Sequence, residues 1–381
     1  MNKQDRTLTL GATVALARPH LDALLDALRA QGYQTRGPRV RDNVLTYGPV
    51  TTLADLPRGY LSHQDAGRYR LEHAGHADYF ALTPGPDTWK RYLFPPRQAL
   101  FHLQRTDNVW EAVAPDHPPA RYALLGVRPC ELAAIQIQDR VFLREDFSDP
   151  HYRAARENLF IIAVNCLHPG ETCFCASLGT GPEARAGYDL LLTELDDVFL
   201  VAVGSEIGRQ LLQPLPWEPA SAFLLNQARQ RLETARQRMG RTLPDPEALP
   251  AALLAHLEHP HWDDVAQRCL SCANCTQVCP TCFCWDVQDE IALSGDRVTR
   301  LRVWDSCFSP QLSYVAGGNA RPGIRARYRQ WLTHKFASWE RQFGTLGCVG
   351  CGRCITWCPA GIDITAELAA LRAAPAQAGG V

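Results

Sequence analysis

Apolar residues in the first 215 positions follow two spacings, one typical of helices and one typical of buried strands. Four leucines repeat at three- and four-residue intervals within 19–32, which predicts an amphipathic helix. Short apolar runs predict strands at 122–127 and 159–164, and a hairpin formed by 190–192 and 198–203. Because helical patterns separate these runs, residues 1–215 are expected to form an α/β domain.

The pattern changes after residue 215. Residues 216–262 are rich in Ala, Leu, Gln and Arg and contain three closely spaced prolines, so they predict a helical connector with a turn. Residues 263–381 hold most of the cysteines and predict a mainly α domain. This domain is interrupted by an insertion at about 285–345, in which we expect a strand at 301–304 and a helix at 324–343.

Two cysteine runs carry the clearest chemical signal. They have identical spacing, C-x2-C-x2-C-x3-C-P: Cys269, Cys272, Cys275 and Cys279 before Pro280, and Cys348, Cys351, Cys354 and Cys358 before Pro359. This is the bacterial ferredoxin pattern for a [4Fe–4S] cluster, whose iron atoms prefer thiolate ligands. Structural zinc sites pair two C-x2-C turns, so the third evenly spaced cysteine argues against zinc. The C-terminal domain is therefore expected to be bacterial-ferredoxin-like, with two [4Fe–4S] clusters.

The fourth cysteine of each run leaves its loop and is expected to reach the other cluster. The predicted ligands are thus Cys269, Cys272, Cys275 and Cys358 for the first cluster, and Cys348, Cys351, Cys354 and Cys279 for the second. Glycines at 347, 350 and 352 are expected to let backbone N–H groups approach the second cluster. The first run has no glycine at the corresponding positions, so the two potentials are expected to differ.

Seven cysteines lie outside the two runs. Cys130 and Cys166 follow predicted strands, and Thr172-Cys173-Phe174-Cys175 recurs as Thr281-Cys282-Phe283-Cys284. Two interpretations stay open for Cys130, Cys166, Cys173 and Cys175: a third metal site, or buried thiols that pack as small apolar side chains. For Cys282, Cys284 and Cys307 we expect packing beside the clusters.

Composition narrows the class of protein. The formal net charge of −1 and the pI near 6.8 give no electrostatic reason to bind nucleic acid. No apolar run reaches the roughly 20 residues of a transmembrane helix. Lys3 and Arg6 precede an apolar stretch that resembles a signal peptide, but polar residues interrupt it, so we expect a retained N-terminus. Clustered cysteines that suit metal ligation predict a reducing, cytoplasmic location.

A basic stretch lies in the predicted insertion helix. Its members are Arg321, Arg325, Arg327, Arg329, His334 and Lys335. We interpret them as a solvated helix face that also balances cluster charge. A docking surface for an acidic partner is the alternative.

These motifs together resemble a family of [4Fe–4S] dicluster electron-transfer proteins, which comprises the sulfhydrogenase beta subunit and the corresponding iron–sulfur component of anaerobic sulfite reductase. The resemblance covers most of the chain. It is carried by 126–131, 165–175, 269–284, 304–307, 327–336 and 347–354. It implies an electron-transfer subunit that is not itself catalytic, with the catalytic metal and the flavin in other subunits.

Four functions follow as candidates. The favoured one is an iron–sulfur relay in a cytoplasmic NADP-linked nickel–iron hydrogenase, whose partners would be a catalytic subunit plus a flavin/NAD(P)-binding subunit. The second is the same relay in anaerobic sulfite reductase. The third is a stand-alone sulfur or disulfide reductase that uses the N-terminal cysteines. The fourth is a module in which the clusters only hold the fold.

Overall fold

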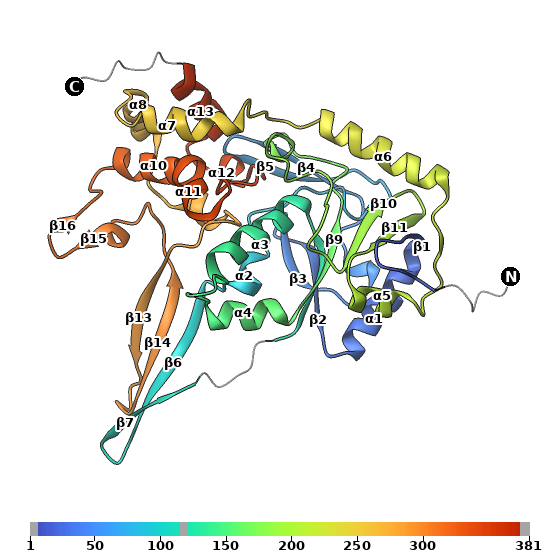
Figure 1. The fold of residues 1–381 in the computed structure, drawn as a ribbon, viewed down its shortest axis with the longest axis horizontal. Coiled ribbons are helices and arrows are strands. Elements are labelled where there is room, and N and C mark those ends of the chain that lie inside the picture. The colour runs from blue at the N-terminus through green and yellow to red at the C-terminus, as the bar shows by residue number, and fades with distance from the viewer. Residues whose placement is uncertain (1–6, 115–119, 374–381) are drawn as a thin grey trace.

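An eight-stranded mixed sheet organises the larger part of the chain in this computed structural model, which describes residues 7–114 and 120–373 (Figure 1). The strand order is β12-β1-β11-β10-β9-β8-β2-β3. The strands are β1 (Thr13–Ala17), β2 (Gln34–Arg41), β3 (Val44–Pro49), β8 (Tyr122–Val127), β9 (Leu159–Val164), β10 (Leu190–Glu194), β11 (Val198–Val203) and β12 (Glu218–Pro219). The central strands β10, β9, β8 and β2 are parallel, and antiparallel strands extend both edges.

Helices cover both faces of this sheet. On one face α1 (Leu21–Ala30) and α5 (Glu206–Leu212) pack on Phe160 and Ile162 of β9. On the other, α3 (Pro129–Phe142) and α4 (Pro150–Glu157) pack on Ile161 and Ala163. Successive residues of a strand point to opposite faces, so burial on both sides requires the continuous apolar runs seen in the sequence. The predicted strands, hairpin and first helix are confirmed. The interrupted apolar stretch after Arg6 forms β1, while Lys3 and Arg6 lie outside the described residues.

Helices dominate the C-terminal part. They are α7 (Leu249–Ala255), α8 (His261–Arg268), α9 (Asn274–Gln277), α10 (Ile324–Thr333), α11 (Trp339–Phe343), α12 (Arg353–Thr356) and α13 (Ile364–Ala373). A second apolar core, which includes Trp262, Tyr328, Trp331 and Phe336, fills the space between them. The helix expected at 324–343 is confirmed, with a π-helical segment at His334–Ser338. In the part of the chain that the structure describes, none of the helices has the length and apolar character required to span a bilayer.

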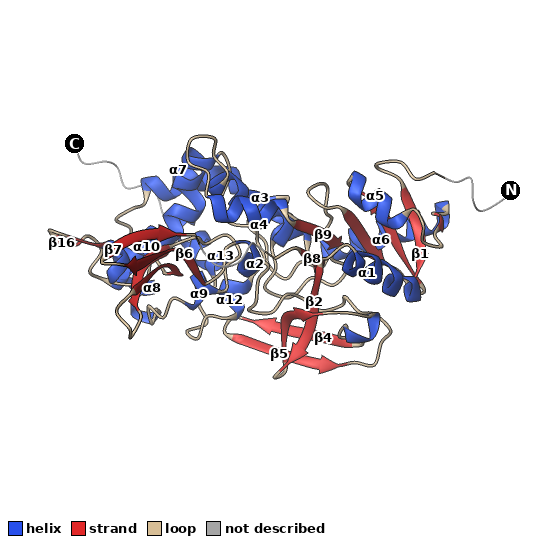
Figure 2. Cartoon of the chain, turned by 90° about the horizontal axis from the view of Figure 1, so that it is seen from below, coloured by secondary structure: helices blue, strands red, loops and turns tan. Residues whose placement is uncertain are grey.

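The expected connector contains a long helix, α6 (Ala222–Gln237), which leads to α7. α6 packs through Ala228 against Ala15 and Leu200 of the main sheet, so it is attached to the α/β part as well as leading away from it. A short helix α2 (Lys90–Leu93) and the hairpin of β4 (Tyr60–Asp65) and β5 (Arg68–His73) complete the N-terminal half. Figure 2 shows this hairpin beside the main sheet.

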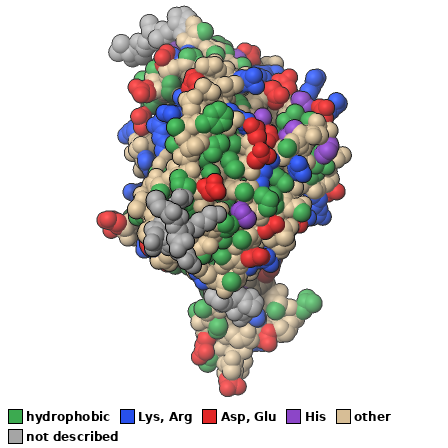
Figure 3. Space-filling model, turned by 90° about the vertical axis from the view of Figure 1, so that its right-hand side faces the viewer, with side chains coloured by type: hydrophobic (Ala, Val, Ile, Leu, Met, Phe, Trp, Pro, Cys, Tyr) green, Lys and Arg blue, Asp and Glu red, His purple; other side chains and the backbone are tan. Residues whose placement is uncertain are grey.

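A four-stranded sheet projects from the body as an arm (Figures 1 and 3). Its order is β13-β14-β6-β7, formed by β6 (Arg97–Thr106), β7 (Val109–Val113), β13 (Trp285–Ile291) and β14 (Arg297–Trp304). β14 pairs with β6, so the predicted insertion at 285–345 is joined by hydrogen bonds to the predicted N-terminal domain. The sequence reveals only the strand at 301–304, because the pairing partner lies far away along the chain. Two further short strands, β15 (Tyr314–Val315) and β16 (Gly318–Asn319), form a turn beside α10.

The cysteine-rich part sits at the carboxyl edge of the parallel strands. β8 leads directly to Cys130, and β9 leads to Cys166. The loop at 172–175, which follows β9, lies against the second cysteine run: the backbone N–H of Phe174 donates to the carbonyl of Gly350 at 2.8 Å. This is the edge at which open parallel sheets usually place their binding loops.

Candidate metal centre

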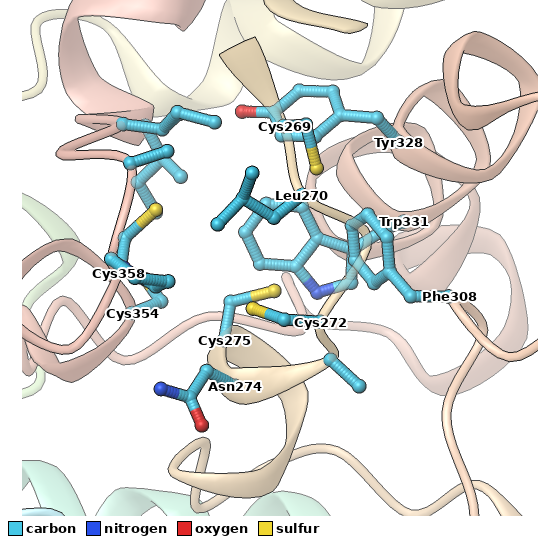
Figure 4. A pocket seen from close by; sticks show the side chains of 15 residues that line it. Cys269, Leu270, Cys272, Asn274, Cys275, Phe308, Tyr328, Trp331, Cys354 and Cys358 are labelled. Carbon is cyan, nitrogen blue, oxygen red and sulfur yellow. The ribbon is translucent and has the colours of Figure 1, made fainter.

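Four predicted ligands line one pocket. Cys269, Cys272, Cys275 and Cys358 surround it, and Figure 4 shows their side chains directed towards the same space. The walls are apolar, formed by Phe308, Tyr328, Trp331, Ile362 and Ile364. The first three cysteines come from the loop before and within α9, while Cys358 comes from the far end of the chain, just after α12. The structure therefore brings together the group that the cross-over rule predicted.

The other four predicted ligands line a second pocket. They are Cys279, Cys348, Cys351 and Cys354, and the lining also includes Phe174, Thr281 and Lys335. Cys354 borders both pockets. The two pockets are therefore neighbours, separated by little more than one side chain.

The two cysteine loops have the same backbone course. Residues at equivalent positions adopt left-handed conformations: Ser271 (φ 51°) and Ala273 (φ 65°) in the first loop, Gly350 (φ 62°) and Gly352 (φ 74°) in the second. In each loop a backbone N–H donates to the sulfur two residues earlier, Ser271 to Cys269 and Gly350 to Cys348, both at 3.4 Å. The expected N–H donor is therefore present in both runs and does not depend on glycine.

Packing explains why only the second loop uses glycine. A Cβ atom at Gly352 would lie 2.4 Å from the carbonyl oxygen of Thr172, and one at Gly350 would lie 2.6 Å from the backbone nitrogen of Cys175. Both distances are impossible for a side chain. The first loop has no such neighbour, so it tolerates Ser and Ala despite their strained conformation.

The thiols that line the two pockets show whether the site suits an iron–sulfur cluster. Burial raises the pKa of the Cys348 thiol to about 12, so this thiol loses its proton only when a cation replaces it. Within 7–114 and 120–373, no three His, Cys, Asp or Glu side chains converge closely enough to hold a single metal ion. Two apolar pockets, lined by five and four spaced thiols with Cys354 in both, suit a larger multi-iron group with thiolate ligands better than one ion.

Lys335 supplies positive charge at the second pocket. Its ammonium is buried, with 2% of the residue exposed, and donates to Cys279 Sγ at 3.3 Å. It also donates to Thr281 Oγ1 at 3.0 Å and the carbonyl of Gly347 at 2.9 Å. Burial alone would lower the pKa of Lys335, but the Cys279 and Cys282 thiolates raise it well above its usual value.

The interpretation of the basic stretch as a solvated face is thus wrong for Lys335 and also for Arg327, which is 8% exposed. Lys335 is spaced from Tyr328, Trp331 and Leu332 by seven, four and three residues, so it lies on the same buried side of the helix. Arg325 and Arg329 do lie on the outer side, where both pair with Glu258.

Lys90 is a second buried lysine beside the cysteines, and the sequence patterns did not single it out. Its ammonium donates to the carbonyl of Cys282 at 3.1 Å and lies 3.8 Å from the centre of the Trp304 ring. Burial lowers the pKa of Lys90 to about 8. The chain has three lysines, and two of them are here. The scarcity of lysine is the feature of the sequence that could have drawn attention to Lys90 and Lys335.

A buried ion pair, also missed, joins the second cysteine loop to the main sheet. Arg353 donates to Glu131 Oε1 at 2.7 Å, and each side chain is only 1% exposed. Tyr47 donates to the other carboxylate oxygen at 2.8 Å, and Arg353 Nε donates to the carbonyl of Gly85. These hydrogen bonds offset part of the cost of removing the pair from water, while Nη1 of Arg353 has no partner among the described residues.

The seven remaining cysteines gather near the same centre. Cys130, Cys166, Cys173 and Cys175 are all buried. Cys173 Sγ lies 3.7 Å from the carbonyl of Cys351, so this group packs on the second loop. Cys282, Cys284 and Cys307 are partly exposed and lie on the other side, where Cys282 Sγ is 3.7 Å from Lys335 Nζ. Their expected place beside the predicted clusters agrees with the structure, whereas a third cluster among the buried four stays a prediction.

Comparison with known proteins gives a consistent result. The family described as "4Fe-4S dicluster domain" matches residues 268–362, which contain both cysteine runs. The chain is 34% identical over 324 residues to sulfhydrogenase 2 subunit beta of Pyrococcus furiosus, which covers 82% of this chain and 91% of the relative. No solved structure matches the chain significantly. The chain belongs to the family of 4Fe–4S dicluster proteins that includes the sulfhydrogenase beta subunits.

Proposed function

We propose that this chain is the iron–sulfur electron-transfer subunit of an oxidoreductase complex and holds two [4Fe–4S] clusters. The observation that carries the proposal is the pair of neighbouring pockets, the first bordered by five and the second by four of the eight predicted ligands, with Cys354 common to both. Cys269, Cys272, Cys275 and Cys358 would hold one cluster, and Cys348, Cys351, Cys354 and Cys279 the other. Clusters of this type accept and release single electrons at potentials set by their surroundings.

The chain's own residues would support this role in two ways. Aromatic and aliphatic side chains such as Tyr328 and Trp331 wall the first pocket and keep water away. Lys335 would offset the negative charge that four thiolates bring to the second pocket. Burial and hydrogen bonding to the ligand sulfurs are the main ways in which a protein adjusts a cluster potential.

We further infer that the complex is a cytoplasmic NADP-linked nickel–iron hydrogenase, whose other components are a catalytic subunit plus a flavin/NAD(P)-binding subunit. The name of the Pyrococcus relative supports the hydrogenase branch over the sulfite reductase branch. The arm supports binding to other subunits, because it exposes Trp110, Val113, Ile291 and Leu293 at its strands and turns. Figure 3 shows this extension below the body, with hydrophobic and acidic side chains on its surface.

The test is iron and sulfide analysis of anaerobically purified protein, together with electron paramagnetic resonance of the reduced state. We expect about eight iron atoms and about eight sulfides per chain. Zinc in place of iron, or absence of inorganic sulfide, would refute the proposal. About twelve iron atoms would instead add a third cluster.

Two serine variants test the exchange of fourth ligands. Cys358→Ser should alter the signal of the cluster held by the first run, and Cys279→Ser that of the cluster held by the second. Cys284→Ser, outside both pockets, is the matched control and should leave both signals unchanged. The exchange of fourth ligands is contradicted if Cys358→Ser alters the signal of the cluster held by the second run instead.

A further inference from the structure

Cys284 and Cys307 meet at the root of the arm, outside both pockets. Cys284 immediately precedes β13, and Cys307 follows β14 by three residues. The ladder between these strands ends with the pair Trp285–Trp304, and the N–H of Asp305 donates to the carbonyl of Cys284 at 2.9 Å. The two cysteines are therefore fixed by a paired backbone and not by a flexible loop.

The two cysteine side chains lie within hydrogen-bonding reach of each other. Cys284 Sγ accepts hydrogen bonds from both the thiol and the backbone N–H of Cys307. These bonds, the thiol bond first, lower the pKa of Cys284 to about 7, while the same interaction raises the pKa of Cys307. A thiolate next to a protonated thiol is the arrangement of an attacking and a resolving cysteine.

The position of the pair allows contact with small molecules. The chain passes within four residues from Thr281, which is 1% exposed, to Trp285, which is 42% exposed, and Cys284 lies on this border. Both cysteines are themselves partly exposed. Cys282, in contrast, lies against Cys279 and Lys335 and belongs to the surroundings of the second pocket.

We propose that Cys284 and Cys307 form a reversible dithiol/disulfide site that reacts with low-molecular-weight disulfides. Cys284 thiolate attacks one sulfur of the disulfide RSSR, a new S–S bond forms, and RS⁻ leaves. Cys307 then attacks Cys284 Sγ and closes the intramolecular disulfide, and the second RS⁻ leaves. The proton of Cys307 goes to a departing thiolate. The protein loses two electrons and RSSR gains two; an external thiol reverses both steps.

The test uses the full chain with its iron content intact, under anaerobic conditions. After treatment with glutathione disulfide, the remaining thiols are alkylated and the peptides are analysed by mass spectrometry. We expect a species in which the peptides of Cys284 and Cys307 are joined and lighter by two hydrogen atoms, and which dithiothreitol converts back. Iron content and visible absorbance are measured in parallel. A failure of the proposed two-cluster assignment can then be distinguished from a failure of the disulfide proposal.

Two variants distinguish the roles of the cysteines. Cys307→Ser should accumulate the glutathione adduct on Cys284, and Cys284→Ser should lower the rate of reaction at this site by at least about tenfold. Ser294→Ala, in the exposed turn between β13 and β14, is the control and should behave as the unmodified chain; Cys284→Ala replaces Cys284→Ser if the serine variant does not fold. The proposal is overturned if Cys284 stays fully open to alkylation after oxidation. It is also overturned if wild type retains the adduct without closing the bond, or if Cys284→Ser loses iron.

Discussion

The ammonium of Lys335 lies 3.3 Å from Sγ of Cys279, a predicted ligand of the second cluster, in a position closed to water. A positive charge at this distance favours the more negative, reduced state of a cluster. We therefore expect Lys335→Met to lower the potential of one cluster only. Loss of a hydrogen bond from a charged donor costs roughly 1.5–3 kcal/mol, which corresponds to roughly 60–130 mV for one electron. A potentiometric titration followed by paramagnetic resonance measures the shift.

Lys90→Met provides the matched control. Lys90 is equally buried, but it donates to the carbonyl of Cys282 and not to a ligand sulfur. Its replacement should shift the same potential by less than half as much. Equal shifts in the two variants would mean that general burial of charge, and not the bond to Cys279, sets the potential.

Gly352→Ala should disrupt the second loop. The new Cβ would lie 2.4 Å from the carbonyl of Thr172, and the residue would keep a left-handed conformation. We expect the strain, at least about 1–2 kcal/mol from the backbone alone, to halve the iron content to about four atoms per chain. Iron analysis and the loss of one resonance signal measure this effect.

Ala273→Gly is the complementary change in the first loop. Ala273 has the same left-handed conformation, so glycine should relieve strain and stabilise the loop by about 1 kcal/mol. Iron content should stay at about eight. A loss of iron in this variant would show that the two loops are not equivalent.

The contributions of Glu131 and Arg353 to the free energy of unfolding should depend strongly on each other. Glu131→Gln leaves the guanidinium buried without a charge partner, and the expected loss is about 3–5 kcal/mol of the free energy of unfolding. Anaerobic urea unfolding followed by tryptophan fluorescence measures it. Tyr47→Phe, which removes a hydrogen bond but no charge, should cost less, about 1.5–3 kcal/mol. The double variant Glu131→Leu/Arg353→Met should recover most of the loss; if it does not, the apolar packing around the pair dominates.

The sequence predicts the parts of this structure in which a local pattern decides the outcome. β8 and β9 are buried on both faces, so their runs are continuously apolar and easy to recognise. The cysteine spacing likewise groups the eight predicted ligands, because each run is a short local motif. β13 and β6 are different: every residue of β13 is exposed, so no burial pattern marks it as a strand.

The neighbours of the predicted clusters depend on long-range packing and cannot be read from local patterns. Lys335 lies on the same buried side of its helix as Tyr328 and Trp331, but the groups that it contacts there come from segments far away along the chain. Glu131 and Arg353 are 222 residues apart, and nothing in either segment specifies the other. The glycines at 350 and 352 were recognised, but their cause is the loop at 172–175 and not the backbone donor to sulfur.

The reactivity of Cys284 should depend on pH in a way that an ordinary thiol does not. Its pKa is lowered to about 7, against an ordinary value near about 8.5. Alkylation by iodoacetamide, read at the peptide that contains Cys284, should therefore rise with pH, reach half its maximum near pH 7 and then level off. Because the folded-state pKa is depressed, the stability from the thiolate is fully present above the unfolded pKa and is lost as pH falls through about 7. Cys307→Ala removes the thiol donor and should move the midpoint upward; an unchanged midpoint would mean that the Cys307 thiol does not activate Cys284.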